Sequence, residues 1–182
     1  IKYYGKDSGW FTAFDGGSYK WLRDKGQGGR NKDARTLFFY IATVNTPAMV
    51  LEMVGVGSQY ALAATDANGQ YLDGSQNYKL TIPKDVPAKD FWSLVVYDPQ
   101  TRSMLQTDQP YPSKNNERNR DMQTNADGST TIWFGPKAPA GKEANWIQTV
   151  SEKGWFVCLR LYGPLKPWFD KTWRPGEIHK VD

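Results

Sequence analysis

The sequence has few of the residues on which most catalytic and metal sites depend. Its 182 residues include one cysteine and one histidine. A disulfide needs two thiols, and a structural zinc site needs several Cys or His ligands, so the composition excludes a disulfide framework, a zinc finger and any metal site built from these ligands alone. Serine and cysteine nucleophiles usually need an imidazole beside them. His179 lies three residues from the end of the chain, and Cys158 lies in an apolar segment. We interpret His179 as an exposed terminal residue and Cys158 as a core residue.

Long hydrophobic runs are also absent. No segment approaches the roughly 20 apolar residues that a transmembrane helix requires, so we predict no membrane span. The first ten residues show no basic segment followed by an apolar one, as a secretory signal would. Ile1 stands where an initiator methionine is usual. We therefore expect the chain to be a processed or truncated piece of a longer protein.

The charge is too evenly mixed for a nucleic-acid surface. Lys and Arg number 23 against 19 Asp and Glu, for a net charge of +4. The densest basic patch holds Lys114, Arg118 and Arg120, but Glu117 and Asp121 are interleaved with it. Proteins that bind nucleic acid normally present an uncompensated basic stripe. We interpret this patch as a solvated loop and predict no nucleic-acid partner.

No glycine-rich or acidic loop has the spacing of a cofactor or metal site. The glycines at 26–29 follow a predicted helix, whereas a phosphate-binding loop lies between a strand and a helix. The segments 66–69 and 125–128 read as tight turns, because the spacing of a calcium-binding loop is missing. We predict no cofactor and no metal.

Alternating apolar residues predict a mainly β fold. Strands are expected over 59–65, 78–82, 91–97, 103–107, 130–134, 155–162 and 177–181. Segments 91–97 and 155–162 are apolar on both faces, which places them centrally in a sheet. The polar segment 108–125 is expected to be a long excursion or lid. Short strands separated by turns at about 8–12 residues favour an antiparallel β-sandwich.

Helices are expected only near the two ends of the chain. Leu37, Tyr40, Ile41 and Val44 have helical spacing, and Asn31 or Asp33 can cap this helix. Pro47 interrupts it, and a second short helix is expected over 48–53. Further short helices are expected over 18–25 and 166–172. The helices before residue 54 would form a cap on the β domain.

Arg160 is the most unusual residue of the predicted strands. Alternation places it inside an apolar strand, on the same face as Cys158 and Tyr162. A buried guanidinium needs a partner, so we expect carboxylate or carbonyl groups to face it. Two interpretations follow: a salt bridge across the sheet, or an anchor for an anionic ligand in a pocket.

The loop 135–146 is the second candidate region. It is rich in proline and glycine and ends in Asn145 beside Trp146, with Lys142 shortly before them. Loops held by a β scaffold often carry binding groups, although a simple connector that buries Trp146 would look the same. The candidate ligand-binding residues are thus Arg160, Asn145, Trp146, Tyr162 and Lys142.

Several long motifs resemble the bacterial family known as domain of unknown function 1214. They lie at 91–105, 125–129, 134–149 and 159–178, and the likeness extends from about residue 54 to the end. It implies an antiparallel jelly-roll-like sandwich over 55–182, preceded by a lead-in segment over 1–54 that packs on it. The resemblance also implies an N-terminal companion domain, domain of unknown function 1254, and export to the bacterial envelope, so a periplasmic location. No catalytic residues follow from it.

Three functional hypotheses remain open. The first is a binding module in which an aromatic cleft takes a small molecule or a glycan, because aromatic residues make up 14% of the chain. The second is a His-independent hydrolase or lyase, in which the carboxylates of Asp98, Asp127 and Glu143 act with Arg and Tyr side chains. The third is an assembly domain that joins copies of itself, as a homo-oligomer, or other partners through an aromatic surface.

Overall fold

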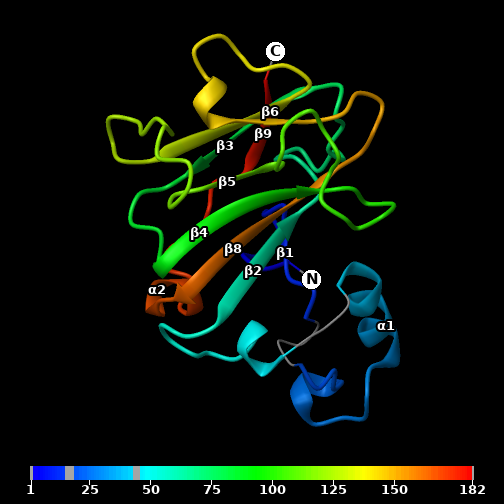
Figure 1. The fold of residues 1–182 in the computed structure, drawn as a ribbon. Helices are drawn as coiled ribbons and strands as arrows, with labels where there is room; N and C mark the ends of the chain where they lie inside the picture. Colours follow the sequence, from blue (N-terminus) through cyan, green and yellow to red (C-terminus); the bar gives the residue numbers. More distant parts are fainter. Residues whose placement is uncertain (1, 15–18, 43–45, 182) are drawn as a thin grey trace.

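The strands of the protein form two β-sheets. The computed structural model describes residues 2–14, 19–42 and 46–181. The larger sheet has the strand order β1-β2-β8-β4-β5, all antiparallel, with β8 in the middle (Figure 1). Its strands span Trp10–Phe11 (β1), Ser58–Ala63 (β2), Ala88–Tyr97 (β4), Ser113–Asn115 (β5) and Phe156–Pro164 (β8). The prediction of a mainly β protein is thus confirmed.

The smaller sheet has the order β7-β6-β3-β9. Its strands span Asn77–Ile82 (β3), Thr130–Gly135 (β6), Trp146–Gln148 (β7) and Ile178–Val181 (β9). The pairs β3–β6 and β3–β9 are antiparallel, whereas β6 and β7 run parallel. The short strands β1, β5 and β7 were not predicted. Strands of two or three residues give almost no alternation from which to predict them.

One connected core takes buried apolar side chains from both sheets. On β8 the core residues are Val157, Leu159 and Leu161, each with no exposed surface. They alternate along the strand, so only one face of β8 enters the core. A buried side chain of this kind stabilises the fold by about 1.5–3 kcal/mol relative to its exposed state. The larger sheet therefore has an inner face in the core and an outer face directed away from it.

The strands and turns in the second half of the chain agree best with the sequence. Segments 78–82 and 130–134 match β3 and β6, and 155–162 matches the central strand β8. The turn at 66–69 forms because the Asp66 carboxylate accepts hydrogen bonds from the backbone N–H groups of Asn68 and Gln70. Gly69 there has φ of +77°, which glycine adopts without strain.

Of two predictions between residues 103 and 125, one is wrong and the other is incomplete. The strand expected over 103–107 is reduced to a single bridge between Tyr97 and Met104. The expected excursion over 108–125 contains the edge strand β5, which pairs with β4. Leu105 packs in the core, so its apolar character reflects the burial of a loop and not a strand. The segment 108–125 is polar, and its pairing at the sheet edge depends on tertiary contacts that local pattern does not show.

Helix α1 (Lys32–Ile41) is where predicted, but it buries a different face. The Asn31 side chain caps it by accepting a hydrogen bond from the backbone N–H of Ala34 at 3.1 Å, as expected. The buried residue is Phe38, whereas Leu37 and Tyr40 of the predicted face are about 60% exposed. Phe38 packs against the rings of Phe14 and Trp21 in a small cluster of its own. Helical spacing alone does not show which side these loop rings will cover. Val44 lies outside the described residues.

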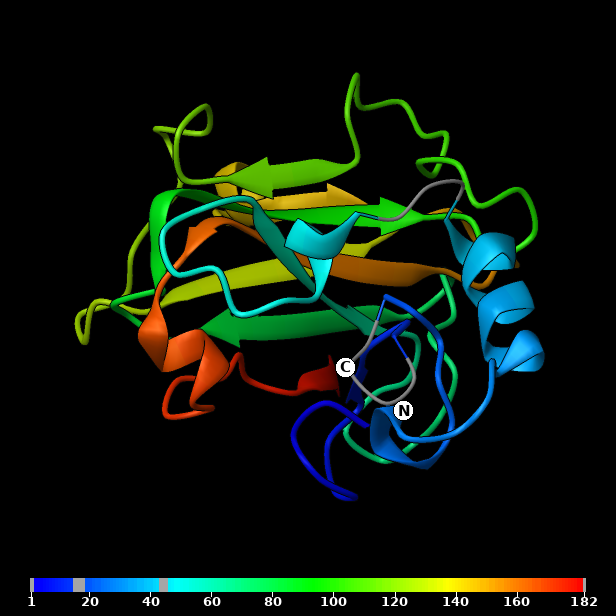
Figure 2. The same ribbon diagram turned by 90° about the horizontal axis from the view of Figure 1, so that it is seen from below.

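The other helices are short. Instead of helices over 18–25 and 48–53, the described residues form single 3₁₀ turns at Asp24–Gly26 and Pro47–Met49. Residue 18 lies outside the described part. Helix α2 (Lys166–Phe169) agrees with the prediction, and it lies on the opposite side of the molecule from α1 (Figure 2). Among the described helices, none has the length and apolar character to cross a membrane.

Candidate functional site

The outer face of the larger sheet carries a polar residue at its centre. Arg160 on β8 lies between Tyr60 on β2 and Ser93 on β4 in the strand register. Cys158 and Tyr162, two residues away on either side, share this face, as the alternation predicts. Neighbouring strands thus surround the guanidinium with side chains of the outer face.

Arg160 is flanked by aromatic rings and has no ionic partner in the described part of the chain. Its guanidinium carbon lies 5.5 Å from the ring centroid of Tyr60 and 5.3 Å from that of Tyr162. Its Nε atom is buried and has no hydrogen-bond partner among the residues that the structure describes. Among the described residues, none of the ion pairs involves Arg160. The expected cluster of carboxylate or carbonyl groups is therefore not found within residues 2–14, 19–42 and 46–181. Cation–π contacts and partial access to solvent stabilise the charge in its place.

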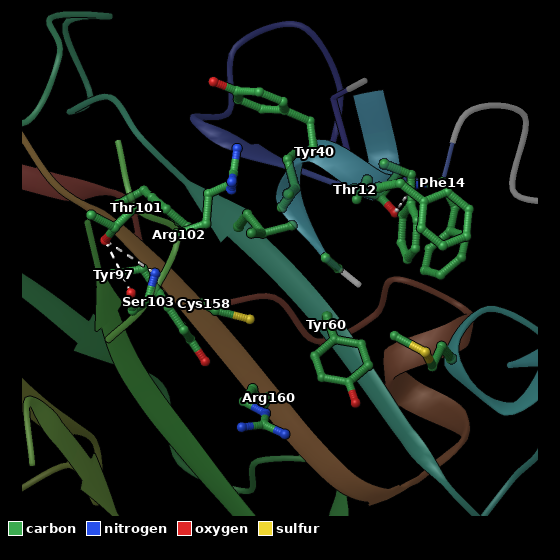
Figure 3. A pocket seen from close by; sticks show the side chains of 18 residues that line it. Thr12, Phe14, Tyr40, Tyr60, Tyr97, Thr101, Arg102, Ser103, Cys158 and Arg160 are labelled. Atoms are coloured by element: carbon green, nitrogen blue, oxygen red, sulfur yellow. Dashed lines mark hydrogen bonds between the residues drawn. The ribbon is translucent and has the colours of Figure 1, made fainter. Parts of the chain in front are cut away.

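A pocket of about 490 Å³ opens above this part of the sheet (Figure 3). Its floor is the outer face of β2, β4 and β8, including Tyr60, Tyr97, Cys158 and Arg160. Phe38 and the end of α1 form one wall, and residues 101–103 form part of the rim. No Asp or Glu is among the described residues that line it. The pocket is thus largely apolar, with a cation at its floor.

Burial keeps the phenols and the thiol near Arg160 protonated. Burial raises the pKa of the Tyr97 and Tyr162 phenols, and it raises the pKa of the Cys158 thiol to about 12. Burial opposes the charge of Arg160, but the neighbouring phenols and thiol outweigh it, so the pKa of the guanidinium is raised. Near neutral pH the site offers neutral phenols, a protonated thiol and a cation. Cys158 is therefore unsuited to act as a nucleophile, which needs the thiolate.

The second predicted group lies at the smaller sheet and does not line the pocket. The buried Asn145 side chain accepts a hydrogen bond from the N–H of Gln123 and donates to the carbonyls of Gln123 and Thr131, all at 2.7–2.8 Å. The Trp146 indole donates to the Gly135 carbonyl at 3.0 Å, and Lys142 is exposed. These bonds favour the interpretation of the loop as a connector. Of the five candidates, the structure brings together only Arg160 and Tyr162, and Tyr162 flanks the guanidinium without lining the pocket.

The three candidate carboxylates hold turns. Asp98 is buried, and its carboxylate pairs with the Lys153 ammonium at 2.8 Å. Burial tends to raise the pKa of Asp98, but hydrogen bonds from Lys153 and from the backbone outweigh this effect and lower it. Hydrogen bonds from Ser129 lower the pKa of Asp127, and Glu143 accepts from the Gly141 N–H. None of these carboxylates lines the pocket. A general acid needs a raised pKa, so their settings do not favour acid catalysis.

Two other sequence interpretations have different outcomes. His179 on β9 is exposed, as expected. In the basic patch Arg118 and Arg120 are exposed, but Lys114 is 9% exposed on β5, so the solvated-loop interpretation is wrong for Lys114. Burial lowers the pKa of Lys114, and Asp121 acts in the opposite direction. Lys114 lies opposite Leu94 in the register, which turns it toward the core side of the sheet.

Sequence reasoning missed much of the pocket. Tyr60 and Tyr97 lie on predicted strands, and their outward positions follow from alternation. Their meeting with Arg160 depends on the strand order β2-β8-β4, which periodicity does not give. The lining residues from α1 and from residues 12–14 depend on how the N-terminal segment packs on the sheet. No local signal in the sequence predicts that packing.

The fold and the site define a β-rich protein of two sheets with a pocket on the outer face of the larger one. The chain belongs to the family described as protein of unknown function (DUF1214), whose model matches residues 57–166. No curated protein matches the chain.

Two solved structures are similar to the chain over most of its length. The VPA0106 protein from Vibrio parahaemolyticus has 24% sequence identity and a TM-score of 0.63, over 90% of this chain and 39% of that one. This likeness shows the fold alone. A putative uncharacterized protein from Burkholderia cenocepacia has 16% identity and a TM-score of 0.46, over 92% of this chain and 47% of that one. The chain therefore spans less than half the length of either protein.

Proposed function

We propose that this chain is a binding module for a small organic molecule, held in the pocket on the outer face of the larger sheet. The observation that carries the proposal is the half-buried Arg160 guanidinium at the floor of an aromatic pocket, where no described residue pairs with its charge or accepts a hydrogen bond from its Nε. A charge kept in such a place without a protein counter-ion is available to a ligand. The volume of about 490 Å³ lies within the usual range of ligand pockets.

The lining favours a small organic molecule over a glycan. A sugar presents several hydroxyl groups, each of which loses hydrogen bonds to water on entering a pocket and needs a protein partner. Most of the surface of the described lining is apolar and includes the side chains of Phe38, Leu62 and Phe156, while hydroxyl groups and two guanidinium groups supply its polar part. Such walls suit a flat or aliphatic body with one polar end.

A bulky side chain at the rim tests the proposal. Ser103 is exposed and lines the pocket, so Ser103→Trp should fill the entrance without disturbing the core. Ser151→Trp, at an exposed turn outside the pocket, is the matched control. A panel of aryl carboxylates, aryl amides and monosaccharides is then screened by thermal shift. At least one compound should raise the Tm of the unchanged protein and the control, but not of Ser103→Trp. A panel without any such compound would contradict the proposal.

We further propose a place for this module in a larger protein. The two sheets share one core, which supports a jelly-roll-like sandwich over 55–182 with the segment 1–54 as its cap. The chain covers 39% of the length of the Vibrio protein, which supports a companion domain in the same polypeptide. The resemblance of the sequence motifs to a bacterial family supports export to the bacterial envelope.

Exposed apolar residues favour an additional role in domain assembly. The segment before β2 exposes a set of large apolar side chains: Leu37, Phe39 and Tyr40 on α1, and Leu51, Val54 and Val56 after it. Exposed apolar clusters often mark contact surfaces. We propose that the companion domain covers the exposed apolar side chains of α1. In hydrogen exchange, α1 should then be better protected in the longer polypeptide than in this chain. Equal protection would contradict this role.

The alternative of a His-independent hydrolase or lyase gains no observation in its favour. Asp98, Asp127 and Glu143 lie outside the described pocket lining, and the pKa of two of them is lowered. The Cys158 thiol is protonated near neutral pH. The arrangement fits binding better than acid–base or nucleophilic chemistry.

A further inference from the structure

We propose that the ligand of this pocket is an organic carboxylate with an apolar body, whose carboxylate pairs with Arg160 and the Tyr97 hydroxyl at the floor. The inference rests on the proposed binding function and names the chemical class of the ligand.

The charge of the pocket selects an anion. Two guanidinium groups line it, Arg160 at the floor and Arg102 at the rim, and no described lining residue is acidic. The Arg102 guanidinium lies 4.3 Å from the ring centroid of Tyr40, and none of the ion pairs in the described residues involves it. In surroundings of low polarity, an uncompensated positive charge attracts an anion more strongly than it would in water. A cationic ligand would meet two like charges with nothing to offset them.

The donors at the floor match a carboxylate. Figure 3 shows the Tyr97 hydroxyl directed to the region of Arg160, with the Tyr60 ring on the other side of the guanidinium. Burial raises the pKa of Tyr97, so its phenol remains a hydrogen-bond donor at neutral pH. A guanidinium donates in a planar fork that fits the two oxygens of a carboxylate. Arg102 lies at the rim against the Tyr40 ring, so the floor itself offers one positive charge, which suits a monoanion better than a phosphate dianion.

The rest of the pocket suits an apolar body. The apolar side chains of Leu62, Phe156 and Phe38 line the same pocket as the guanidinium. A second cavity of about 370 Å³ adjoins the first and shares Leu62, Phe156 and Tyr40 with it. Its described lining is also free of acidic residues and is mostly apolar. The combined groove therefore has room for an aryl or alkyl body that extends away from the charged end.

The test compares two ligands that differ only in charge. The affinities of 3-phenylpropanoate and 3-phenylpropanamide for the full chain are measured by isothermal titration calorimetry. The acid should bind about 10- to 100-fold more tightly, since hydrogen bonds to a charged group are worth about 1.5–3 kcal/mol. Arg160→Gln should reduce this preference to less than about threefold, and Tyr97→Phe should reduce it partly. Arg118→Gln, at an exposed position outside the pocket, serves as the matched control and should leave both affinities unchanged.

The outcomes separate this inference from the proposed function. Equal binding of acid and amide, blocked by Ser103→Trp, would overturn the carboxylate and leave the binding module intact. No binding of either compound to the unchanged chain would count against both the carboxylate and the binding function.

Phenyl phosphate serves as the third ligand, and it should bind no more tightly than the carboxylate. Tighter binding of the phosphate would overturn the assignment of a monoanion. If circular dichroism shows that Arg160→Gln does not fold, the test rests on Tyr97→Phe. An unchanged preference of that variant for the acid over the amide would contradict the proposed contact of the carboxylate with Arg160 and Tyr97.

Discussion

The two faces of the larger sheet are made by the same strands, but they differ in burial and in polarity. On β8, Leu159 and Leu161 of the inner face are fully buried in the core, while Arg160 between them points to the outer face. The inner face is closed by the second sheet. On the outer face, the buried Nε of Arg160 has no hydrogen-bond partner in the described residues. A single strand can therefore serve stability on one side and ligand binding on the other, and neighbouring residues should respond in opposite ways to substitution.

The largest effect is expected on the inner face. Leu159→Ala removes a fully buried side chain from the centre of the core. The loss of apolar burial and the cavity left behind should lower the free energy of unfolding by about 2–5 kcal/mol. Urea denaturation followed by tryptophan fluorescence measures this. A loss under about 1 kcal/mol would contradict the assignment of this face to the core.

A smaller loss is expected where the loop 135–146 ends. Asn145→Ala removes three hydrogen bonds that the buried Asn145 amide forms with the backbone of Gln123 and Thr131. The free energy of unfolding should fall by about 1–3 kcal/mol. Lys142→Ala, at an exposed site in the same loop, is the control and should change it by about 0.5 kcal/mol or less. If Asn145→Ala instead leaves stability intact and weakens ligand binding, the connector interpretation is wrong.

The rim of the pocket should respond to acid. Asp98 holds the turn before residues 101–103 by accepting hydrogen bonds from the Gln100 N–H and the Lys153 ammonium. These bonds lower its pKa in the folded protein, so its contribution to stability is complete above the ordinary value near 3.9. That contribution is lost as the pH falls from this value through the lower folded pKa. Asp98→Asn should therefore be less stable than the unchanged protein at pH 7, and this difference should shrink below pH 4. Urea denaturation at pH 7 to 2 measures it, and a constant difference would exclude the carboxylate as its source.

The smallest effect on stability is expected at Arg160. Arg160→Leu removes a half-buried charge that has no carboxylate partner in the described residues. Replacement of a charge by an apolar side chain of similar size is often neutral or stabilising. The free energy of unfolding should therefore change by less than about 1 kcal/mol, in the same urea assay as Leu159→Ala. A loss of several kcal/mol would show that Arg160 holds the fold through a partner, as in a salt bridge across the sheet.

The same contrast explains what could be predicted from the sequence. Alternation along 155–162 located the central strand and put Arg160, Cys158 and Tyr162 on one face, because the two-residue period fixes side-chain direction. It could not show whether a carboxylate faced the guanidinium, since that depends on which strands lie alongside. The helical spacing of Leu37 and Tyr40 predicted a helix and the wrong buried face, because the rings that cover Phe38 come from a distant loop. Local pattern thus predicted the elements, while the pocket depends on contacts between segments far apart in the chain.

The central claim is that the outer face holds a guanidinium that is ready to pair with an anion. The most direct measurement follows the Nε–H resonance of Arg160 by ¹⁵N NMR, assigned by its loss in Arg160→Leu, during titration with 3-phenylpropanoate and then with 3-phenylpropanamide. We expect the carboxylate to shift this resonance in a saturable manner and the amide to leave it nearly unchanged. A resonance that neither compound shifts, while other pocket residues respond, would contradict the claim.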